Sequence, residues 1–245
     1  NDHPDGVNIN TDCGSTHMEA LQNFVREKGL DIGVAFDGDA DRCLAVDENG
    51  NEIDGDKIMA IISNYLRNKG KLAKDTLVAT VMSNLGLHKY ARDNGLELAQ
   101  TQVGDRYVLE EMLKEGYNLG GEQSGHVILL DYNPTGDGIL TSLMLIQAIL
   151  EANKTASQMA EIIKLYPQVL VNAKVNADKK YDYNKDTEIQ EAIEKLEKEF
   201  AGNGRVLIRP SGTEPLVRVM IEGEDQEYIT KKAKEIADLI EKKLK

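Results

Sequence analysis

Three aspartates alternate with small residues in the stretch AFDGDADRC, which covers residues 35–43. Asp37, Asp39 and Asp41 follow an apolar run, so in an extended loop at a strand end their carboxylates can converge. Unpaired carboxylates this close would repel one another, whereas hard divalent cations bind converging carboxylate oxygens. The spacing therefore predicts a divalent-metal site, with a solvated acidic loop as the alternative.

The residues around this acidic loop indicate which metal it binds. The loop matches part of the calcium-binding EF-hand template, but Arg42 stands where that template needs Gly, and strands rather than helices are expected on both sides. Three carboxylates leave room for water or a phosphate oxygen, the arrangement that Mg²⁺ commonly takes. Arg42 itself can clamp a phosphate oxygen or form a salt bridge to one of the aspartates, and the sequence leaves both roles open.

A second polar loop, GGEQSGH, covers residues 120–126. Glycines bracket Glu122, Gln123 and Ser124, and we expect these three side chains to project together and bind sugar hydroxyls or an amine. The spacing of Gly and Ser does not match the GxSxG turn of hydrolases. His126 is suited to acid–base chemistry near neutral pH or to a hydrogen bond within its own loop. The alternative for the whole stretch is a polar turn without function.

A third loop, RPSGTEPLVR, combines two hydroxyls and successive backbone amides in a turn between two prolines, with an arginine at each end. Arginine binds phosphate through paired hydrogen bonds, and successive amides form anion-binding turns. These arginines form a local cationic spot in a chain of net charge −13. The loop predicts a phosphate site, with an ordinary proline–glycine turn as the alternative. The residues assigned to it are Arg209, Ser211, Gly212, Thr213 and Arg218.

The composition sets limits on the class of protein. A chain of 245 residues, 41% hydrophobic and 29% charged, is long enough for more than one folded domain. Its acidic balance argues against nucleic acid or an anionic membrane as a partner, and no apolar run approaches the roughly 18 residues of a membrane span. Cys13 and Cys43 lack a CxxC spacing, which fits a reducing cytoplasmic setting without zinc or disulfides.

The apolar periodicity predicts the elements that hold these loops. Strands flank the acidic loop, and Asn49-Gly50 marks a hairpin turn after them. Helices and strands then alternate, which favours a mainly parallel sheet covered by helices and ends in one long helix over about residues 138–163. After Pro167 the pattern is that of an α+β domain. The predicted fold class is α/β with mixed sheets covered by helices plus this C-terminal α+β domain, with domains at 1–53, 54–166 and 167–245.

Together the three loops resemble those of one known family. DGDADR, GGEQSGH and RPSGTEPLVR occur in the order in which the α-D-phosphohexomutase family carries its metal-binding, sugar-recognition and phosphate-binding loops, and the resemblance covers essentially the whole chain. The EQSGH form, with VGDRYV at 103–108 and CGSTHMEAL at 13–21, is similar to the bacterial phosphoglucosamine mutase branch. The resemblance implies the end of that family's domain 2, followed by its domains 3 and 4.

The resemblance also implies an isomerase that interconverts glucosamine 6-phosphate and glucosamine 1-phosphate through glucosamine 1,6-bisphosphate. This reaction feeds UDP-N-acetylglucosamine and peptidoglycan synthesis in the cytoplasm. By the same resemblance, Asp37, Asp39 and Asp41 are expected to bind Mg²⁺, Arg42 to contact the transferring phosphate and His126 to transfer a proton. The resemblance also implies that Glu122 and Ser124 bind the sugar. The residues that it implies for binding the non-reacting phosphate are Arg209, Ser211, Gly212, Thr213 and Arg218.

One family feature has no counterpart in the sequence. The nucleophile of the family is a phosphorylated serine in a TASHNP-like loop of domain 1, and no such stretch occurs here. We therefore expect the chain to be the C-terminal part of a longer protein, inactive by itself, with the missing N-terminal domain as a partner; a homodimer is left open. The alternatives are a phosphomannomutase or phosphoglucomutase relative, a Mg²⁺-dependent phosphatase, and a non-catalytic metal-binding module.

Overall fold

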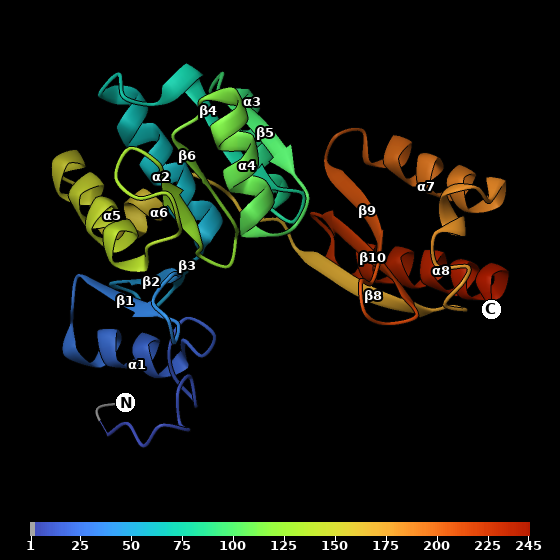
Figure 1. The fold of residues 1–245 in the computed structure, drawn as a ribbon, viewed down its shortest axis with the longest axis horizontal. Helices are drawn as coiled ribbons and strands as arrows, with labels where there is room; N and C mark the ends of the chain where they lie inside the picture. Colours follow the sequence, from blue (N-terminus) through green and yellow to red (C-terminus); the bar gives the residue numbers. More distant parts are fainter. Residues whose placement is uncertain (1–2) are drawn as a thin grey trace. The chain divides into compact units, whose positions relative to one another are not determined.

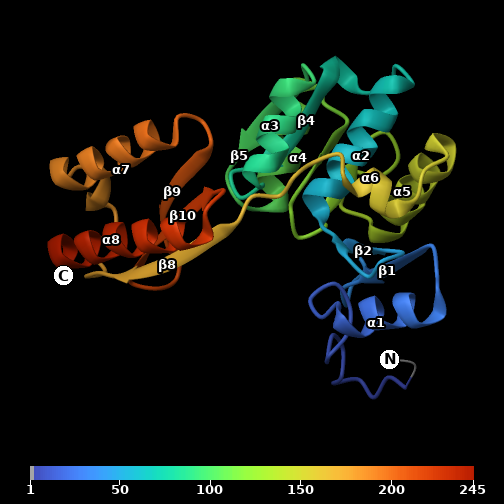
Figure 2. The ribbon, with the colours of Figure 1, turned by 180° about the vertical axis from the view of Figure 1, so that it is seen from behind.

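The computed structural model describes residues 3–245 and divides into two compact units, unit 1 up to Lys164 and unit 2 from Leu165. Each unit combines helices and strands (Figure 1, and from behind in Figure 2). Unit 1 contains two sheets and unit 2 a third, so the predicted α/β fold with mixed sheets and a C-terminal α+β part is confirmed. Among residues 3–245, no helix has both the length and the apolar character needed to cross a membrane.

The smaller sheet of unit 1 carries the acidic loop at a turn. Its strands are antiparallel in the order β1-β2-β3, and residues 37–42 connect β1 to β2. Helix α1 covers one face, where its Val25 packs with Leu44 and Val46 of β2. Gly33 of β1 lies directly under α1, since an added Cβ would lie 2.7 Å from the Val25 side chain. The bounds are α1 Glu19–Lys28, β1 Ile32–Phe36, β2 Cys43–Asp47 and β3 Glu52–Ile53.

The larger sheet of unit 1 has the order β5-β4-β6-β7, in which β4 is parallel to β5 and β6 and β7 is antiparallel to β6. Helices α3 and α4 lie beside β4 and β5 (Figures 1 and 2). Val108 and Met112 of α4 pack on Val78 and Ile128 of the sheet. The bounds are α2 Gly55–Asn68, η1 Ala73–Asp75, β4 Thr76–Thr80, α3 Leu85–Asp93, β5 Glu97–Thr101, α4 Asp105–Glu115, β6 Leu119–Gly121, β7 Val127–Leu129, α5 Gly138–Ala152 and α6 Ala156–Ala160.

The prediction of one long helix over about residues 138–163 is wrong, because α5 and α6 are separate helices. Asn153 ends α5 in the left-handed conformation at φ 52°, which Asn adopts more easily than most residues. Thr155 then starts α6 with a capping box, in which its side chain accepts from the Gln158 amide and the Gln158 side chain accepts from the Thr155 amide. The apolar periodicity runs through this break and concealed it.

The start of α6 is fixed to the small sheet by Glu48, which lies in the turn between β2 and β3. Its carboxylate accepts hydrogen bonds from the Ser157 amide at 3.0 Å and from the Ser157 hydroxyl. Burial alone would raise the pKa of this carboxyl, but hydrogen bonds from Ser157 and Thr155 outweigh it and lower the pKa to about 2. The anionic form of Glu48 therefore contributes to the stability of unit 1.

Glu48→Gln is expected to lower the free energy of unfolding by about 1–2 kcal/mol near pH 7, and by less near about pH 3.5. The folded pKa of about 2 lies below the ordinary value of 4.5, so this stabilisation is present above pH 4.5 and is lost as the pH falls toward 2. Urea unfolding at both pH values measures it. Glu161→Gln removes the same charge from an exposed position and serves as the control. An equal loss at both pH values would contradict the expectation.

Unit 2 is a three-stranded antiparallel sheet in the order β8-β10-β9, packed against α7 and α8. Asp186 and Asp225 start the two helices by accepting hydrogen bonds from the amides of Ile189 and Tyr228. The third predicted loop is the turn between β9 and β10. The bounds are β8 Gln168–Lys174, η2 Asp182–Asn184, α7 Thr187–Phe200, β9 Gly204–Pro210, β10 Leu216–Gly223 and α8 Gln226–Leu244.

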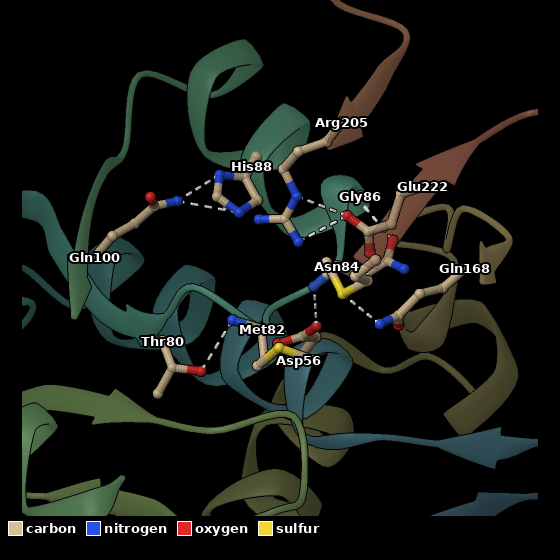
Figure 3. A network of polar contacts seen from close by, with 11 residues as sticks. Asp56, Thr80, Met82, Asn84, Gly86, His88, Gln100, Gln168, Arg205 and Glu222 are labelled. Carbon is tan, nitrogen blue, oxygen red and sulfur yellow. Dashed lines mark hydrogen bonds and ion pairs between the residues drawn. The ribbon is translucent and has the colours of Figure 1, made fainter. Parts of the chain in front are cut away.

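An ion pair joins β9 and β10 at the end of this sheet. Arg205 and Glu222 are directly opposite in the register, and Oε2 of Glu222 lies 2.8 Å from Nε and 2.7 Å from Nη2 of Arg205 (Figure 3). The Glu222 side chain is fully buried and that of Arg205 is 18% exposed. A buried carboxylate of this kind depends on its cationic partner, because removing one charge of the pair takes from the other the attraction that offsets its desolvation.

Candidate functional site

The turn between β1 and β2 brings together the three aspartates that the sequence predicts as metal ligands. Asp37, Asp39 and Asp41 each offer one carboxylate oxygen, and these oxygens lie within 4.8 Å of one another. Ala40 adopts φ 59° between them and bends the backbone. The flanking elements are strands, so the loop is not an EF-hand, whose loop lies between two helices. Carboxylates at this separation can share one divalent cation.

Arg42 closes the acidic loop. Its amide donates to Oδ1 of Asp37 at 3.1 Å, and its Nε lies 3.8 Å from Oδ2 of the same carboxylate. The structural salt bridge considered from the sequence is therefore present, although it is long. The Arg42 side chain is 43% exposed, so part of its guanidinium remains accessible to a ligand.

His126 lies behind the acidic loop and holds one of its aspartates. Its ring is buried, and Nδ1 lies 2.9 Å from Oδ2 of Asp41, which is 85 positions away in the chain. Residues 42 and 126 also form an isolated β-bridge, which brings the ring to this place. A carboxylate fixed by an imidazole N–H has the orientation typical of a metal ligand supported from behind. The contact joins the first two predicted loops, and proton transfer by His126 stays a prediction.

Mg²⁺ fits the donor set of this loop. Within residues 3–245, Oδ1 of Asp41 is buried and accepts no hydrogen bond, while its Oδ2 is engaged by His126. A buried carboxylate oxygen without a donor is unfavourable unless a cation binds it. Asp39 is exposed, which leaves an open side for water or a phosphate oxygen. Hard oxygen ligands with an open side suit Mg²⁺.

The start of α5 supports both His126 and the acidic loop, and the sequence reasoning missed it. The Gly138 amide donates to the Ala40 carbonyl at 2.9 Å, and a Cβ at Gly138 would lie 2.6 Å from the Arg42 carbonyl. A Cβ at Gly136 would lie 2.4 Å from the His126 ring. Two glycines around the helix-capping Asp137 were the available signal, since glycine permits such close approach.

The second polar loop is a tight turn between β6 and β7. The Glu122 amide donates to the His126 carbonyl, and the Gly125 amide donates to the Glu122 carbonyl. Ser124 is exposed at the tip, and Oε1 of Glu122 accepts a hydrogen bond from the Gly104 amide at 3.1 Å. The expectation that Gln123 projects with its neighbours is wrong, because its side-chain amide donates a hydrogen bond to the Asp54 carboxylate at 3.3 Å. Asp54 lies 69 positions away in the sequence, so the local pattern did not reveal this hydrogen bond.

Backbone contacts join the polar loop to the strands around it. The Cys43 amide donates to the Gly125 carbonyl, and the Gly55 amide donates to the Gln123 carbonyl. A Cβ at Gly125 would lie 2.4 Å from the Cys43 carbonyl, so only glycine permits this approach. Burial raises the pKa of the Cys43 thiol to about 12, so this cysteine is an inert packing residue. Unit 1 therefore presents the acidic and polar loops as one connected site.

The predicted phosphate loop of unit 2 is the turn between β9 and β10, and two of its backbone amides are available to a ligand. The Ser211 amide donates to the Leu216 carbonyl at 2.8 Å, and the Ser211 hydroxyl accepts from the Glu214 amide. In the described part of the chain, the amides of Gly212 and Thr213 have no acceptor, and both residues are exposed. Successive amides in such a turn form an anion-binding concavity.

Two arginines face each other across the base of the phosphate loop. Arg209 and Arg218 are paired in the register of β9 and β10. Like charges directly opposite on neighbouring strands are destabilising. Burial, and then the charge of Arg218, lower the pKa of the Arg209 guanidinium. Nε of Arg218 is buried without a hydrogen-bond partner in residues 3–245, and its ion pair with Glu214 is 3.7 Å long. A bound anion would compensate both arginines.

Comparison with known proteins agrees with this architecture. Three models of one family, phosphoglucomutase/phosphomannomutase, match the chain: alpha/beta/alpha domain II over residues 3–50, alpha/beta/alpha domain III over residues 54–166 and the C-terminal domain over residues 170–239. The chain belongs to the phosphoglucomutase/phosphomannomutase family of α-D-phosphohexomutases. The resemblance inferred from its motifs is thereby confirmed.

Several curated relatives at about 60% identity are phosphoglucosamine mutases, the branch that the motifs indicated. Those of Ruminiclostridium cellulolyticum and Clostridium tetani are each 60% identical to the chain over 244 and 245 residues and cover all of it. The chain spans about 54% of the length of the first and 55% of the second.

Solved structures show the same fold. N-acetylphosphoglucosamine mutase of Aspergillus fumigatus superposes with a TM-score of 0.76 at 22% identity, over 95% of this chain and 53% of that one. The same enzyme in complex with GlcNAc-6P and magnesium has a TM-score of 0.74 at 22% identity, over 95% of this chain and 53% of that one. The α/β architecture of the two units is therefore that of the phosphohexomutases.

Proposed function

We propose that this chain contributes the metal-, sugar- and phosphate-binding loops of a phosphoglucosamine mutase. Together with a domain that carries a phosphorylated serine, it interconverts glucosamine 6-phosphate and glucosamine 1-phosphate through glucosamine 1,6-bisphosphate. The observation that carries the proposal is the contact between Asp41 and His126, which joins the acidic and polar loops in one site. Relatives at 60% identity with the name phosphoglucosamine mutase support the choice of sugar.

In this proposal Asp37, Asp39 and Asp41 would hold Mg²⁺, which would supply charge neutralisation for phosphoryl transfer. Arg42 exchanges its long contact with Asp37 for a phosphoryl oxygen, because a guanidinium binds such oxygens in a fixed geometry. His126 acts in proton transfer, with its ring oriented by Asp41 through Nδ1.

Substrate binding divides between the polar loop and the phosphate loop. Glu122 and Ser124 bind sugar hydroxyls, since the first offers a carboxylate and the second an exposed hydroxyl. The non-reacting phosphate of the hexosamine binds at the β9–β10 turn, through Arg209, Ser211, Gly212, Thr213 and Arg218. The proposed setting is a reducing cytoplasm, which suits two cysteine thiols that are not joined in a disulfide. A homodimer stays a prediction.

The proposal is tested by measuring mutase turnover before and after the chain is mixed with a domain that carries the donor serine. The purified chain is assayed with Mg²⁺, glucosamine 6-phosphate and a hexose 1,6-bisphosphate, before and after addition of a separately expressed N-terminal segment of a related phosphoglucosamine mutase. We expect glucosamine 1-phosphate only after mixing, because the TASHNP-like stretch that carries the donor serine of the family does not occur in this sequence.

The other outcomes separate the alternatives. Release of inorganic phosphate by the chain alone would instead indicate a phosphatase. Equal turnover of glucose or mannose phosphates after mixing would contradict the glucosamine assignment. Absence of turnover, together with Ca²⁺ binding and no affinity for sugar phosphates, would indicate a metal-binding module.

A further inference from the structure

Lys180 lies next to the phosphate loop, although it belongs to the connection between β8 and α7. Its Nζ donates to the Ser211 carbonyl at 3.0 Å. The side chain is half-buried, and Nζ lies 5.3 Å from the centroid of the neighbouring Tyr181 ring, where a cation is favoured. Ser211 is itself buried and follows Arg209 by two positions. A third cationic group is therefore hydrogen-bonded to the loop that carries the two arginines.

The fold holds the β8–α7 connection against both sides of the phosphate loop. On one side the Val175 amide donates to the Pro215 carbonyl at 3.1 Å. On the other side the Tyr183 hydroxyl donates to the Ile208 carbonyl at 3.2 Å. Lys180 lies between these two anchors in the sequence, so its position beside the loop follows from the packing of unit 2.

The charge of Lys180 has no acidic partner within residues 3–245, although the chain carries 42 acidic residues. Lys185, in the same connection, forms an ion pair with Asp182 at 2.9 Å. An ammonium group has three donors, and the Ser211 carbonyl occupies one of them. Lys180 thus adds a positive charge to the loop that already carries the opposed Arg209 and Arg218, and like charges favour a site for an anion.

We propose that Lys180 is a further residue of the phosphate site and donates to the phosphate group that Arg209 and Arg218 bind. This inference rests on the proposed function of the loop and deepens it. Lys180 adds a point charge with rotatable donors to the fixed donors of the two arginines. The carbonyl of Ser211 holds the ammonium in place before the ligand arrives, which lowers the entropy lost on binding.

Lys180→Gln is expected to weaken the binding of glucosamine 6-phosphate about tenfold, because it removes one charge-assisted hydrogen bond. Lys180→Arg keeps the charge and is expected to stay within about threefold of the unchanged chain. Since salt screens interactions between accessible charges, the affinity of Lys180→Gln is also expected to fall less steeply with added KCl. A residue that only supports the turn would leave this salt dependence unchanged.

The experiment titrates the full chain with glucosamine 6-phosphate by calorimetry at several KCl concentrations and follows the Gly212 and Thr213 amides by NMR. Lys179→Gln is the matched control, because its Nζ also donates to a backbone carbonyl, that of Lys245 at 3.1 Å. Arg218→Met tests the loop itself. Melting temperatures are recorded for every variant.

The outcomes distinguish the inference from the proposed function on which it rests. Weaker binding by Lys180→Gln with a shallower salt dependence, with Lys179→Gln unchanged, supports Lys180 as a phosphate ligand. Binding that Arg218→Met weakens but Lys180→Gln leaves unchanged overturns the role of Lys180 alone. The role of Lys180 is also overturned if Lys180→Gln loses affinity that Lys180→Arg does not restore, while its melting temperature falls and its salt dependence is unchanged. If the unchanged chain shows no shift of the two amides, the phosphate loop itself is refuted.

Discussion

Asp39→Asn is expected to abolish the rise in melting temperature that Mg²⁺ produces, while making the metal-free chain slightly more stable. Asp39 is exposed, and no hydrogen bond or ion pair to it occurs in the described part of the chain. Its substitution therefore removes no contact of the fold. It does relieve repulsion among three carboxylates that lie within 4.8 Å of one another.

The expected sizes follow from linkage. Mg²⁺ at 100 times its dissociation constant stabilises the folded state by about 2.7 kcal/mol, which is roughly 5–10 °C for a unit of this size. Relief of this repulsion, through the exposed Asp39, contributes about 0.5 kcal/mol in the metal-free chain. Turnover of the protein reconstituted with a serine-bearing domain is expected to fall about 100-fold or more, because a preorganised charge at the reacting phosphate is lost.

Differential scanning calorimetry with and without Mg²⁺ measures both effects. Asp31→Asn is the matched control, since Asp31 is also exposed and lies at the opposite end of β1. This control should keep the full response to Mg²⁺. A Mg²⁺ response in Asp39→Asn equal to that of the unchanged chain would contradict the metal site, as would a lower stability of this variant without metal.

Arg205→Met is expected to destabilise unit 2 by about 3–5 kcal/mol, the largest effect on stability that we predict. The substitution leaves the Glu222 carboxylate, which is fully buried, without the guanidinium at 2.7 Å (Figure 3). Desolvation of that charge is then no longer offset by its closest cation. Hydrogen exchange of the β10 and α8 amides and urea unfolding measure the loss.

Two variants serve as controls for this prediction. Arg205→Met combined with Glu222→Gln should recover part of the loss, because a neutral amide costs less to bury than an unpaired carboxylate. Lys198→Met breaks an exposed pair with Glu194 in the same unit and should cost within about 0.5 kcal/mol. Equal losses of unfolding free energy in Arg205→Met and Lys198→Met would contradict the prediction that the buried pair contributes more to stability than the exposed one.

The sequence predicted the parts of this protein that depend on local patterns. Alternation of aspartates after an apolar run placed the acidic loop at the end of β1, where the structure has it. The change of periodicity after Pro167 predicted the α+β part, and three motifs in order indicated the family. These inferences hold because strand ends, turns and helix faces are set by residues a few positions apart.

The misjudged elements had partners distant in the sequence or competing local signals. Gln123 was expected to face a ligand but donates to Asp54. Gly138 was interpreted only as the start of a helix and Gly136 was not singled out, yet Gly136 approaches the His126 ring and Gly138 the Arg42 carbonyl. The break between α5 and α6 did have a local signal in Asn153 and the capping box after it, but the apolar periodicity outweighed that signal.

The sequence by itself therefore determined which chemical groups are present, in which order, and on which kind of turn. Only the tertiary structure decided which groups meet: His126 with Asp41, 85 positions apart, and Lys180 with the Ser211 carbonyl, 31 positions apart. Local propensity acts through neighbours within one or two turns of the chain. Contacts across such separations arise when the apolar faces of helices and sheets pack, because burial of apolar surface selects the arrangement of the elements.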